Sequence, residues 1–400
     1  MIYLDNAAST QIHDDVLNSM LPYLKEQYGN PSSIHRYGRL TRKAIHKARK
    51  QIASLINADP AEILITSGGT ESNNTVLMGI SSQFPSGQII TSSIEHDAIL
   101  EPCKKLSANG FQVDYLPVDT FGMINLSNLE NIISKNTRLV SIMFGNNEVG
   151  TIQPIAKIAK ICHENGVLFH TDAVQAVGKL PVDVKELDID LLSISAHKLH
   201  GPKGIGALYI KNGVKVNPLI LGGGQEFRLR SGTENVASIV GFGQACEIAQ
   251  NHLDENISYI KKLQTLLVES VLDQIPETTF NGHFEFRLSN NAHFTFLGVN
   301  GEDLIIKLDE YGIAASTGSA CSVNTQKSSH VLESMGFSLE QITGSLRLTV
   351  GIFNTENEIK ETEKLYKLKE KILVPYGYGR LDTLLKEKEE FQKTELMIEL

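Results

Sequence analysis

The sequence predicts an α/β protein with a mostly parallel, mixed sheet flanked by helices, and a second, smaller α+β domain. Between residues 63 and 195, short apolar runs alternate with segments of helical apolar spacing. Such alternation is typical of parallel strands joined by crossover helices. Beyond residue 280 the order of elements becomes irregular, and 400 residues exceed the size at which one core usually keeps growing. Two domains are therefore expected.

The N-terminal part predicts a short edge strand and two helices. Residues 3–6 read as an edge strand and turn, and apolar spacing indicates a helix at 14–28 that the Asn-Pro-Ser-Ser run at 30–33 ends. A longer amphipathic helix is predicted at 38–56. Its apolar face should carry Leu40, Ala44, Ala48, Ile52 and Leu55, and its basic face is expected to be solvated.

The following elements are predicted from apolar runs and their spacing. Strand-like runs lie at 63–66, 88–90, 113–116, 137–144, 167–171 and 191–195, and helical segments at 98–108, 126–134 and 155–164. Residues 236–271 are helical in spacing throughout and should contain the domain junction. Later strands are expected at 291–296, 313–315 and 345–350, and helices at 301–310 and 328–335. We expect a large domain at 15–260, a small domain formed by 1–14 and 261–376, and a helical tail at 377–400.

Composition excludes several classes of protein. A net charge of -9 argues against a nucleic-acid-binding surface, and no apolar run approaches the length of a membrane span. The N-terminus lacks the basic and apolar regions of a signal peptide, so a cytoplasmic protein is expected. Four widely separated cysteines, with no C-x-x-C pair, fit neither a disulfide framework nor a zinc site. No metal site is predicted.

Lys198 follows the apolar run 190–194 and precedes a glycine-rich turn. A lysine at the end of a strand in an open α/β sheet lies where ligands bind, and its amine could bind a carbonyl cofactor covalently. Residues 67–74 run from a strand into a helix through Gly68 and Gly69. The free N–H groups of such a helix start attract an anion, so this is a candidate phosphate cradle; a capped strand-to-helix turn is the simpler alternative.

Two further residues complete a set that suits pyridoxal phosphate. Asp172 follows a predicted strand and could hold the protonated ring nitrogen, although helix N-cap is a common use of Asp. His96 could stack on the ring, although a lone histidine in a loop is more often a surface residue. The cradle, His96, the Asn146-Asn147 pair, Asp172 and Lys198 follow successive predicted strands. That order favours one common site over a separate, purely structural role for each of the five features.

The chain resembles the cysteine desulfurases of the iron-sulfur-cluster and nitrogen-fixation type, within the class V aminotransferase group. The resemblance extends from residue 3 to about 351 and implies the pyridoxal-phosphate-dependent transferase fold type I. The motifs that carry it are, in chain order, YLDNAAST, NPSSIH, TSGGTESNN, SIEH, NNEVG, HTDAVQA, SAHKLHGPKG, RSGTEN, TGSACS and SLRLTVG.

The resemblance implies a role for each matching residue. Lys198 would bear the cofactor, Asp172 would hold the pyridine nitrogen and His96 would stack on the ring. Gln175 would contact the ring hydroxyl, and Asn147 would also lie at the cofactor. The phosphate would be bound at Gly69 by residues that include Thr70, Ser195 and His197, and by Thr233 of the neighbouring subunit, since the family forms homodimers with shared active sites.

Arg347 and Cys321 are the candidates for the substrate chemistry. An arginine fork between Leu346 and Leu348 suits bidentate capture of a substrate carboxylate, with Asn147 beside it; a surface strand arginine is the alternative. Cys321 lies among small residues, as a reactive loop thiol would, whereas Cys103, Cys162 and Cys246 fall in helix-like apolar segments. The implied reaction converts L-cysteine to L-alanine and leaves a persulfide on Cys321 for an acceptor such as an iron-sulfur scaffold protein. The catalytic residues would be Lys198, Cys321 and His96.

Three alternatives stay open at the level of the sequence. Another enzyme of the same fold, a class V aminotransferase or a selenocysteine lyase, is one kind, and a non-catalytic scaffold for cluster assembly is another. The chain departs from the family pattern at Thr317, where serine is more usual, and at 143–145. The stretch after Pro375 matches nothing closely, although relatives use this end to dock sulfur acceptors.

Overall fold

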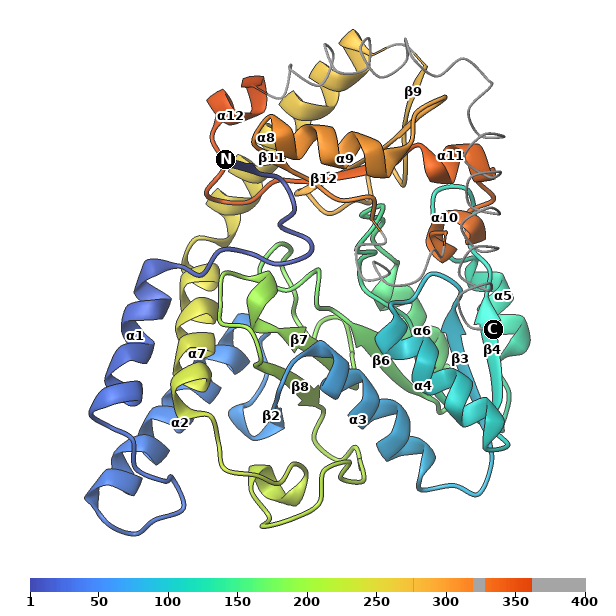
Figure 1. Ribbon diagram of the computed structural model, residues 1–400. Coiled ribbons are helices and arrows are strands. Elements are labelled where there is room, and N and C mark those ends of the chain that lie inside the picture. The colour runs from blue at the N-terminus through green and yellow to red at the C-terminus, as the bar shows by residue number, and fades with distance from the viewer. Residues whose placement is uncertain (276, 319–327, 362–400) are drawn as a thin grey trace, which may run out of the picture.

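The computed structural model describes residues 1–275, 277–318 and 328–361 (Figure 1). A large sheet with its helices forms the lower body in Figure 1, and a smaller group of strands and helices lies above it, beside the N-terminus. Helices α7 and α8 run one after the other along the left side and connect the two parts. Within the described residues, no helix is both long and apolar enough to cross a membrane.

The helices and strands have the following bounds. The helices are α1 (Asp14–Lys25), α2 (Arg36–Leu55), α3 (Gly69–Ser81), α4 (Asp97–Ala108), α5 (Leu126–Ile132), α6 (Ile155–Glu164), α7 (Val236–Asn251), α8 (Leu253–Gln274), α9 (Gly301–Glu310), α10 (His330–Ser334), α11 (Leu339–Thr343) and α12 (Glu356–Glu361). The strands are β1 (Ile2–Tyr3), β2 (Ile63–Thr66), β3 (Gln88–Ser92), β4 (Gln112–Leu116), β5 (Thr137–Ser141), β6 (Leu168–Asp172), β7 (Leu191–Ser195), β8 (Gly206–Ile210), β9 (Thr278–Phe280), β10 (Asn291–Phe296), β11 (Ile313–Ala314) and β12 (Ser345–Thr349).

The main sheet has seven strands in the order β2-β8-β7-β6-β5-β3-β4. β8 runs antiparallel to both of its neighbours, β2 and β7, and the remaining pairs are parallel. The prediction of a mostly parallel, mixed sheet is therefore confirmed. β8 was not predicted as a strand. The carboxyl ends of β2, β3, β5, β6 and β7 meet at one edge, where ligands bind in sheets of this kind.

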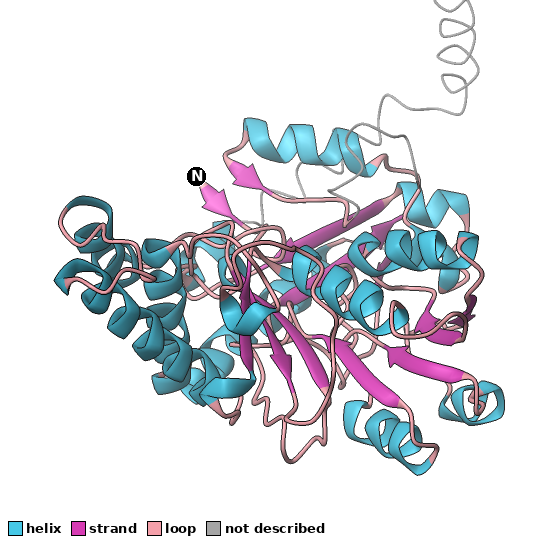
Figure 2. Ribbon diagram, turned by 90° about the horizontal axis from the view of Figure 1, so that it is seen from below, coloured by secondary structure: helices cyan, strands magenta, loops and turns pink. Residues whose placement is uncertain are grey.

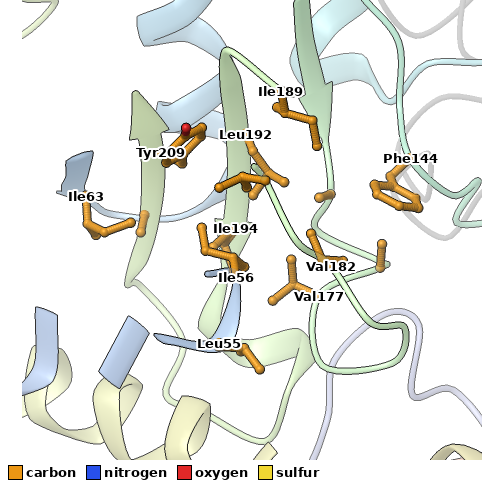
Figure 3. Close-up of a cluster of buried hydrophobic side chains, with 14 of the residues drawn as sticks. Leu55, Ile56, Ile63, Phe144, Val177, Val182, Ile189, Leu192, Ile194 and Tyr209 are labelled. Carbon is orange, nitrogen blue, oxygen red and sulfur yellow. The ribbon is translucent and has the colours of Figure 1, made fainter. Parts of the chain in front are cut away.

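Helices cover both faces of the main sheet, as the view in Figure 2 shows. Side chains alternate along each strand, so neighbouring residues enter different cores. Ile63 of β2 and Leu192 of β7 belong to the core that α2, α6 and α7 cover, part of which is drawn in Figure 3. Leu64 and Leu191 belong to the opposite core, which α3 and α4 cover. The sheet is thereby buried on both sides and presents its edge to the site.

The upper part has its own apolar core. An antiparallel sheet of order β12-β10-β9 packs with α8 and α9 around Phe294, Leu348 and Leu308, and β1 pairs in parallel with β11 nearby. Ile2 and Leu4 join this core, so the N-terminal strand belongs with the C-terminal elements. The domain boundaries expected at 14/15, 260/261 and 376/377 stay a prediction. The tail at 377–400 lies outside the described residues.

Three sequence predictions need correction. In α2 the buried positions include Thr41, not Leu40, whose side chain is 39% exposed. Arg49, expected on the solvated basic face, is buried, and its Nη2 forms an ion pair with Glu226 Oε1 at 2.6 Å. The helical stretch expected at 236–271 divides into α7 and α8 at His252, where the backbone departs from helical angles.

Candidate active site

Lys198 ends the short 3-10 turn Ala196–Lys198 that follows β7, at the carboxyl edge of the sheet. Its Nζ donates to the backbone oxygens of Ala7 and Ala8, at 2.6 and 2.7 Å. These two residues come from the N-terminal segment that belongs with the upper part of the molecule. The amine therefore lies at the junction between the large sheet and the N-terminal strand, and it is half-buried.

Asp172 is the last residue of β6, the strand next to β7. Its carboxylate is 8% exposed and accepts hydrogen bonds from Asn73 Nδ2, at 2.6 Å, and from the backbone N–H of Val174, at 3.0 Å. No helix follows Asp172 before β7, so the helix N-cap alternative is wrong. Asn73, on α3, was not singled out from the sequence, since an asparagine inside a helix gives no signal of its tertiary partner.

The start of α3 forms a cradle that side chains leave open. Gly68, the N-cap residue, has a φ of 150° and provides no side-chain cap for the first N–H groups. A Cβ on Gly69 would lie 2.6 Å from Val174 Cγ2, and a Cβ on Gly68 would lie 3.7 Å from Ser195 Oγ. Glycine is therefore required at Gly69 for close approach to the loop after Asp172. The uncapped N–H groups and the helix dipole at this point suit an anion.

His96 and Thr70 line one open pocket of about 480 Å³ between the starts of α3 and α4. His96 is the N-cap of α4: its Nδ1 accepts from the N–H of Ala98 at 3.0 Å, and its ring is half-buried. The stacking role of His96 and its alternative, a surface loop histidine, both stay predictions. His197 is also near Lys198, and its Nδ1 lies 3.3 Å from Ser9 Oγ. Burial, with the positive charge of Lys198, lowers the pKa of His197 to about 4.

Gln175 and Lys198 share an acceptor. Gln175 Nε2 donates to Ala7 O at 2.9 Å, the same oxygen that accepts from Lys198. Thr233 lies elsewhere: it is exposed and lines a second pocket, of about 190 Å³, together with Thr66 and Ser67. The structure thus brings Gln175 to Lys198 and places Thr233 in a separate pocket with Thr66 and Ser67.

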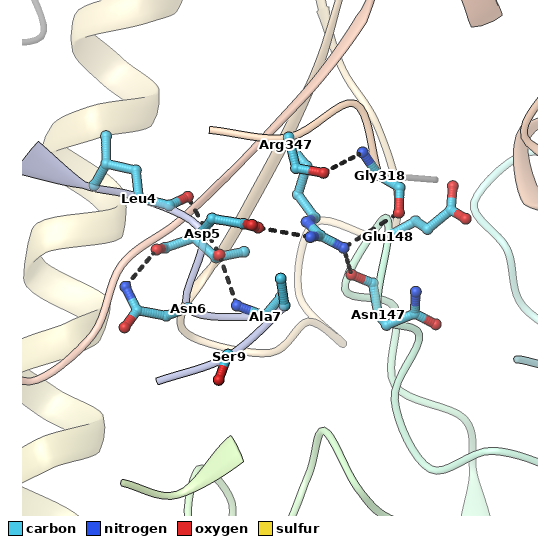
Figure 4. Close-up of polar contacts among 12 residues, drawn as sticks. Leu4, Asp5, Asn6, Ala7, Ser9, Asn147, Glu148, Gly318 and Arg347 are labelled. Atoms are coloured by element: carbon cyan, nitrogen blue, oxygen red, sulfur yellow. Dashed lines mark hydrogen bonds and ion pairs between the residues drawn. The ribbon is translucent and has the colours of Figure 1, made fainter. Parts of the chain in front are cut away.

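Arg347, on β12, is 2% exposed, so the surface strand alternative is wrong. Its guanidinium donates to Asp5 Oδ1 at 2.7 Å, to Asn147 O at 2.9 Å and to Gly318 O at 3.3 Å (Figure 4). Its Nε is buried without a hydrogen-bond partner among the described residues. The pairing with Asp5 was not foreseen, because nothing local relates residues so far apart in the chain.

Three buried titratable residues near the site were given no role from the sequence. Burial raises the pKa of Glu95 to about 8, and its Oε1 accepts from Ser92 Oγ at 2.6 Å. Burial also raises the pKa of Glu148, whose Oε2 accepts from Ser329 Oγ at 2.6 Å. Lys179 is buried beside Gln175. The described cysteines, Cys103, Cys162 and Cys246, are buried and unpaired, as expected, and Cys321 lies outside the described residues.

The residues present fit pyridoxal phosphate. A half-buried amine, a buried carboxylate on the adjacent strand, an uncapped helix start and an open pocket with a histidine lie along one sheet edge. Asn73 Oδ1 and Thr171 Oγ1, next to the carboxylate, are buried without protein partners among the described residues. The donor set matches the needs of this cofactor: an amine for its aldehyde, an acid for its ring nitrogen and an anion site for its phosphate.

Known proteins resemble the chain over most of its length. The family model "Aminotransferase class-V" matches residues 2–362. A cysteine desulfurase IscS from Methanosarcina thermophila is 50% identical over 360 residues, which are 90% of this chain and 89% of that protein. A second IscS, from Dictyoglomus turgidum, is 47% identical over 94% of this chain and 96% of that protein.

Solved structures agree with the fold. A NifS-like protein superposes with a TM-score of 0.87 at 40% identity, covering 92% of this chain and 99% of that one. A NifS-like protein from Rickettsia africae gives 0.84 at 33% identity, covering 93% and 100%. A structure described as SspA in complex with cysteine gives 0.79 at 36% identity, covering 89% and 100%. The chain therefore belongs to the class V aminotransferase family of pyridoxal-phosphate-dependent enzymes and, within it, to the cysteine desulfurases.

Proposed function

We propose that this protein converts L-cysteine to L-alanine and transfers the sulfur to its own Cys321 as a persulfide. One observation carries the proposal: the loops after β2, β3, β6 and β7 supply an anion cradle, a histidine, a carboxylate and a lysine at one sheet edge, with Arg347 beside them. The names of the relatives, cysteine desulfurase in each case, support the same reaction. A cysteine complex among the structural neighbours supports the substrate.

The cofactor would be held by residues from five segments. Lys198 binds its aldehyde, Asp172 keeps its ring nitrogen protonated and His96 stacks on the ring. Bound in this way, pyridoxal phosphate supplies a conjugated system that stabilises negative charge at the Cα of an amino acid. Gln175 and Asn147 lie at the ring. The remaining ligands hold the phosphate: Gly69, Thr70, Ser195 and His197, with Thr233 from the second subunit of a homodimer.

Arg347 positions the substrate. Its guanidinium is buried and donates a hydrogen bond to Asn147 O, which fixes the orientation of the planar fork. A buried, planar fork favours a carboxylate bound through two parallel hydrogen bonds. Because Asp5 already occupies Nη2, the carboxylate of L-cysteine would exchange with the carboxylate of Asp5 on binding.

Lys198 and Cys321 carry the chemistry. The Lys198 amine takes the proton from Cα of the substrate, which its place at the carboxyl end of β7 allows. The Cys321 thiolate attacks the substrate sulfur, so that an S–S bond forms as the Cβ–S bond breaks. The carbon chain keeps the electron pair of the broken bond and takes up a proton to give L-alanine. Cys321 is left as a persulfide, and no external oxidant or reductant is needed.

The sulfur acceptor, the cellular compartment and the domain division are also part of the proposal. We propose delivery of the sulfur to an acceptor protein such as an iron-sulfur scaffold, in the cytoplasm. Three unpaired buried thiols, among the residues that the structure describes, suit a reducing compartment. We also propose that residues 15–260 form the cofactor-binding domain and that 1–14 with 261–376 form the smaller one, which is consistent with their separate apolar cores.

The products of a single incubation test the function. Purified protein loaded with pyridoxal phosphate is incubated with L-cysteine and a thiol reductant, and the amino acid and keto acid products are quantified. Alanine without a keto acid supports the proposal. A keto acid with transfer of the amino group would indicate an aminotransferase, and a strong preference for selenocysteine over cysteine would indicate a selenocysteine lyase. Failure to bind pyridoxal phosphate would revive the scaffold alternative.

A further inference from the structure

Lys179 is a buried lysine that the proposed mechanism does not use. It follows Gly178 in the turn after Asp172 and is 7% exposed. Among the described residues, no carboxylate forms an ion pair with it. Its Nζ donates instead to the backbone oxygen and to the side-chain Oε1 of Gln175, both at 3.2 Å. A buried lysine without a carboxylate is costly, so its position calls for an explanation.

The surroundings of Lys179 disfavour its protonated, charged form. Burial, with the positive charges of Lys198 and Arg347, lowers the pKa of Lys179 to about 7. Lys179 and Lys198 line the same small cavity, of about 30 Å³, together with Asn6. The two amines are therefore electrostatically coupled, although they belong to different loops.

The hydrogen bonds of Gln175 fix which way its side-chain amide faces. Charged Lys179 has only N–H donors, and neutral Lys179 still has two, one for each bond that it donates to Gln175 O and Oε1, so the amide presents Oε1 to Lys179. Nε2 then faces Ala7 O, which also accepts from Lys198. If the amide turned over, Gln175 Nε2 would face the N–H groups of Lys179, and Gln175 Oε1 would face the backbone oxygen of Ala7. Neither pair could form the hydrogen bond that the structure shows. Lys179 thus holds Gln175 in the orientation in which Nε2 donates on the side where Lys198 lies.

We propose that Lys179 is a positioning residue for the cofactor: it locks the amide of Gln175 so that only N–H groups face the ring oxygen of pyridoxal phosphate. The proposal rests on the proposed function, which places Gln175 at that oxygen. An N–H donor stabilises the deprotonated oxygen and disfavours the protonated one. Through the shared acceptor Ala7, the same chain of hydrogen bonds, Lys179 to Gln175 to Ala7, also sets where the Lys198 amine rests.

The test compares Lys179→Met with wild type and with Lys185→Met, an exposed lysine on a nearby loop. Three quantities are measured: the thermal midpoint of the apoprotein, the dissociation constant for pyridoxal phosphate and the absorption spectrum of the bound cofactor. Lys179→Met removes the cost of burying an amine but leaves two Gln175 oxygens without this donor, so the apoprotein should stay folded with a thermal midpoint near that of wild type. Cofactor affinity should nevertheless fall about tenfold, with a shifted absorption maximum, because a hydrogen bond to a charged group is weakened.

A double-mutant cycle separates positioning from a general structural effect. Lys179→Met should cost no further affinity in a Gln175→Leu background, since the group that it orients is gone. A full, additive loss in that background would overturn the proposal, as would wild-type affinity and spectrum in Lys179→Met. If wild type and Lys185→Met both fail to bind pyridoxal phosphate, the proposed function itself fails, and the inference falls with it.

Gln175→Glu keeps the proposal testable if Lys179→Met does not fold. Glutamate has the shape of glutamine and forms an ion pair with Lys179, so the apoprotein should remain folded. It presents oxygens where glutamine presents Nε2, so affinity for pyridoxal phosphate should fall at least tenfold and the spectrum should shift. Unchanged affinity in Gln175→Glu would contradict the assignment of Gln175 as an obligatory donor.

Discussion

Nη2 of Arg347 lies 2.7 Å from Oδ1 of Asp5, and the two side chains are 3% and 18% exposed. This ion pair joins β12 to the segment after β1, next to Ala7 and Ala8, which accept hydrogen bonds from Lys198. In the proposed function, Asp5 occupies the place on Arg347 that the substrate carboxylate would take. The arginine is already desolvated and oriented before substrate binds.

Arg347→Lys should raise the KM for L-cysteine by about ten- to a hundredfold while the affinity for pyridoxal phosphate stays unchanged. Lysine retains the charge but loses the planar fork, which costs about 1.5–3 kcal/mol for a charge-assisted pair. Steady-state kinetics and a cofactor titration measure the two quantities. Arg39→Lys, an exposed position on α2, is the matched control. A KM within twofold of wild type in Arg347→Lys would remove Arg347 from the substrate site.

Asp5→Asn should lower the KM for L-cysteine, because the incoming carboxylate no longer competes with an ionised one for Nη2. We expect a decrease of about three- to tenfold, the effect of weakening one partly buried ion pair. Kinetics at several salt concentrations measure it. A raised KM would show that Asp5 orients Arg347 and does not compete with the substrate.

Gly69→Ala should weaken binding of pyridoxal phosphate about tenfold or more, since the new Cβ would lie 2.6 Å from Val174 Cγ2. Valine is stiff at χ1, so the loop after Asp172 must shift away from the start of α3. Adding Val174→Ala should restore most of the affinity by removing the clash. If the double variant binds pyridoxal phosphate no more tightly than Gly69→Ala alone, the close contact with Val174 is not the reason that this position needs glycine.

His163 should make the stability of the fold depend on pH. Its ring nitrogens lie 2.8 Å from Asp188 Oδ2 and 2.8 Å from Asp190 Oδ2. Partial burial works against the charged form, but hydrogen bonds to Asp190 and Asp188 raise the pKa of His163 above its ordinary value. A raised folded-state pKa gives stability that is fully present below the unfolded value of about 6.5 and is lost as pH rises through the folded value.

Urea unfolding of wild type and His163→Gln at about pH 5.5, 7 and 9 measures this contribution. The difference in free energy of unfolding should be largest at the lowest pH, about 1 kcal/mol because His163 is 27% exposed, and should shrink as the pH rises. His46→Gln, on the exposed side of α2, is the control. A difference that does not change with pH would mean that His163 acts through packing alone.

Local patterns in the sequence predicted most of the fold because they report which residues each element buries. The strands β2, β3, β5, β6 and β7 were expected to within a few residues, and their polar loops were expected at one edge of the sheet. β8 was missed, since Gly206–Ile210 follows the lysine loop directly and pairs back on β7 as an antiparallel neighbour. Short hairpin returns of this kind break the alternation on which the prediction was based.

The candidate site was predictable where motifs lie at strand ends and was not predictable where partners are distant. Lys198, Asp172 and His96 each follow a recognisable strand. Asp5 and Lys179 could not be assigned, because their roles depend on Arg347 and Gln175 and on burial that only the tertiary structure creates. Leu40 lies one position, about 100° of helical rotation, before Thr41, and Thr41 is the residue buried at that turn of α2.

Cys321 is proposed to accept sulfur from L-cysteine. Mass spectrometry of the protein after incubation with L-cysteine, without reductant, tests it most directly. We expect the peptide containing Cys321 to gain the mass of one sulfur atom that dithiothreitol removes. Cys321→Ser protein, still loaded with pyridoxal phosphate, should show no gain and form no alanine. Added sulfur on another cysteine, or alanine formation by Cys321→Ser at the wild-type rate, would contradict it.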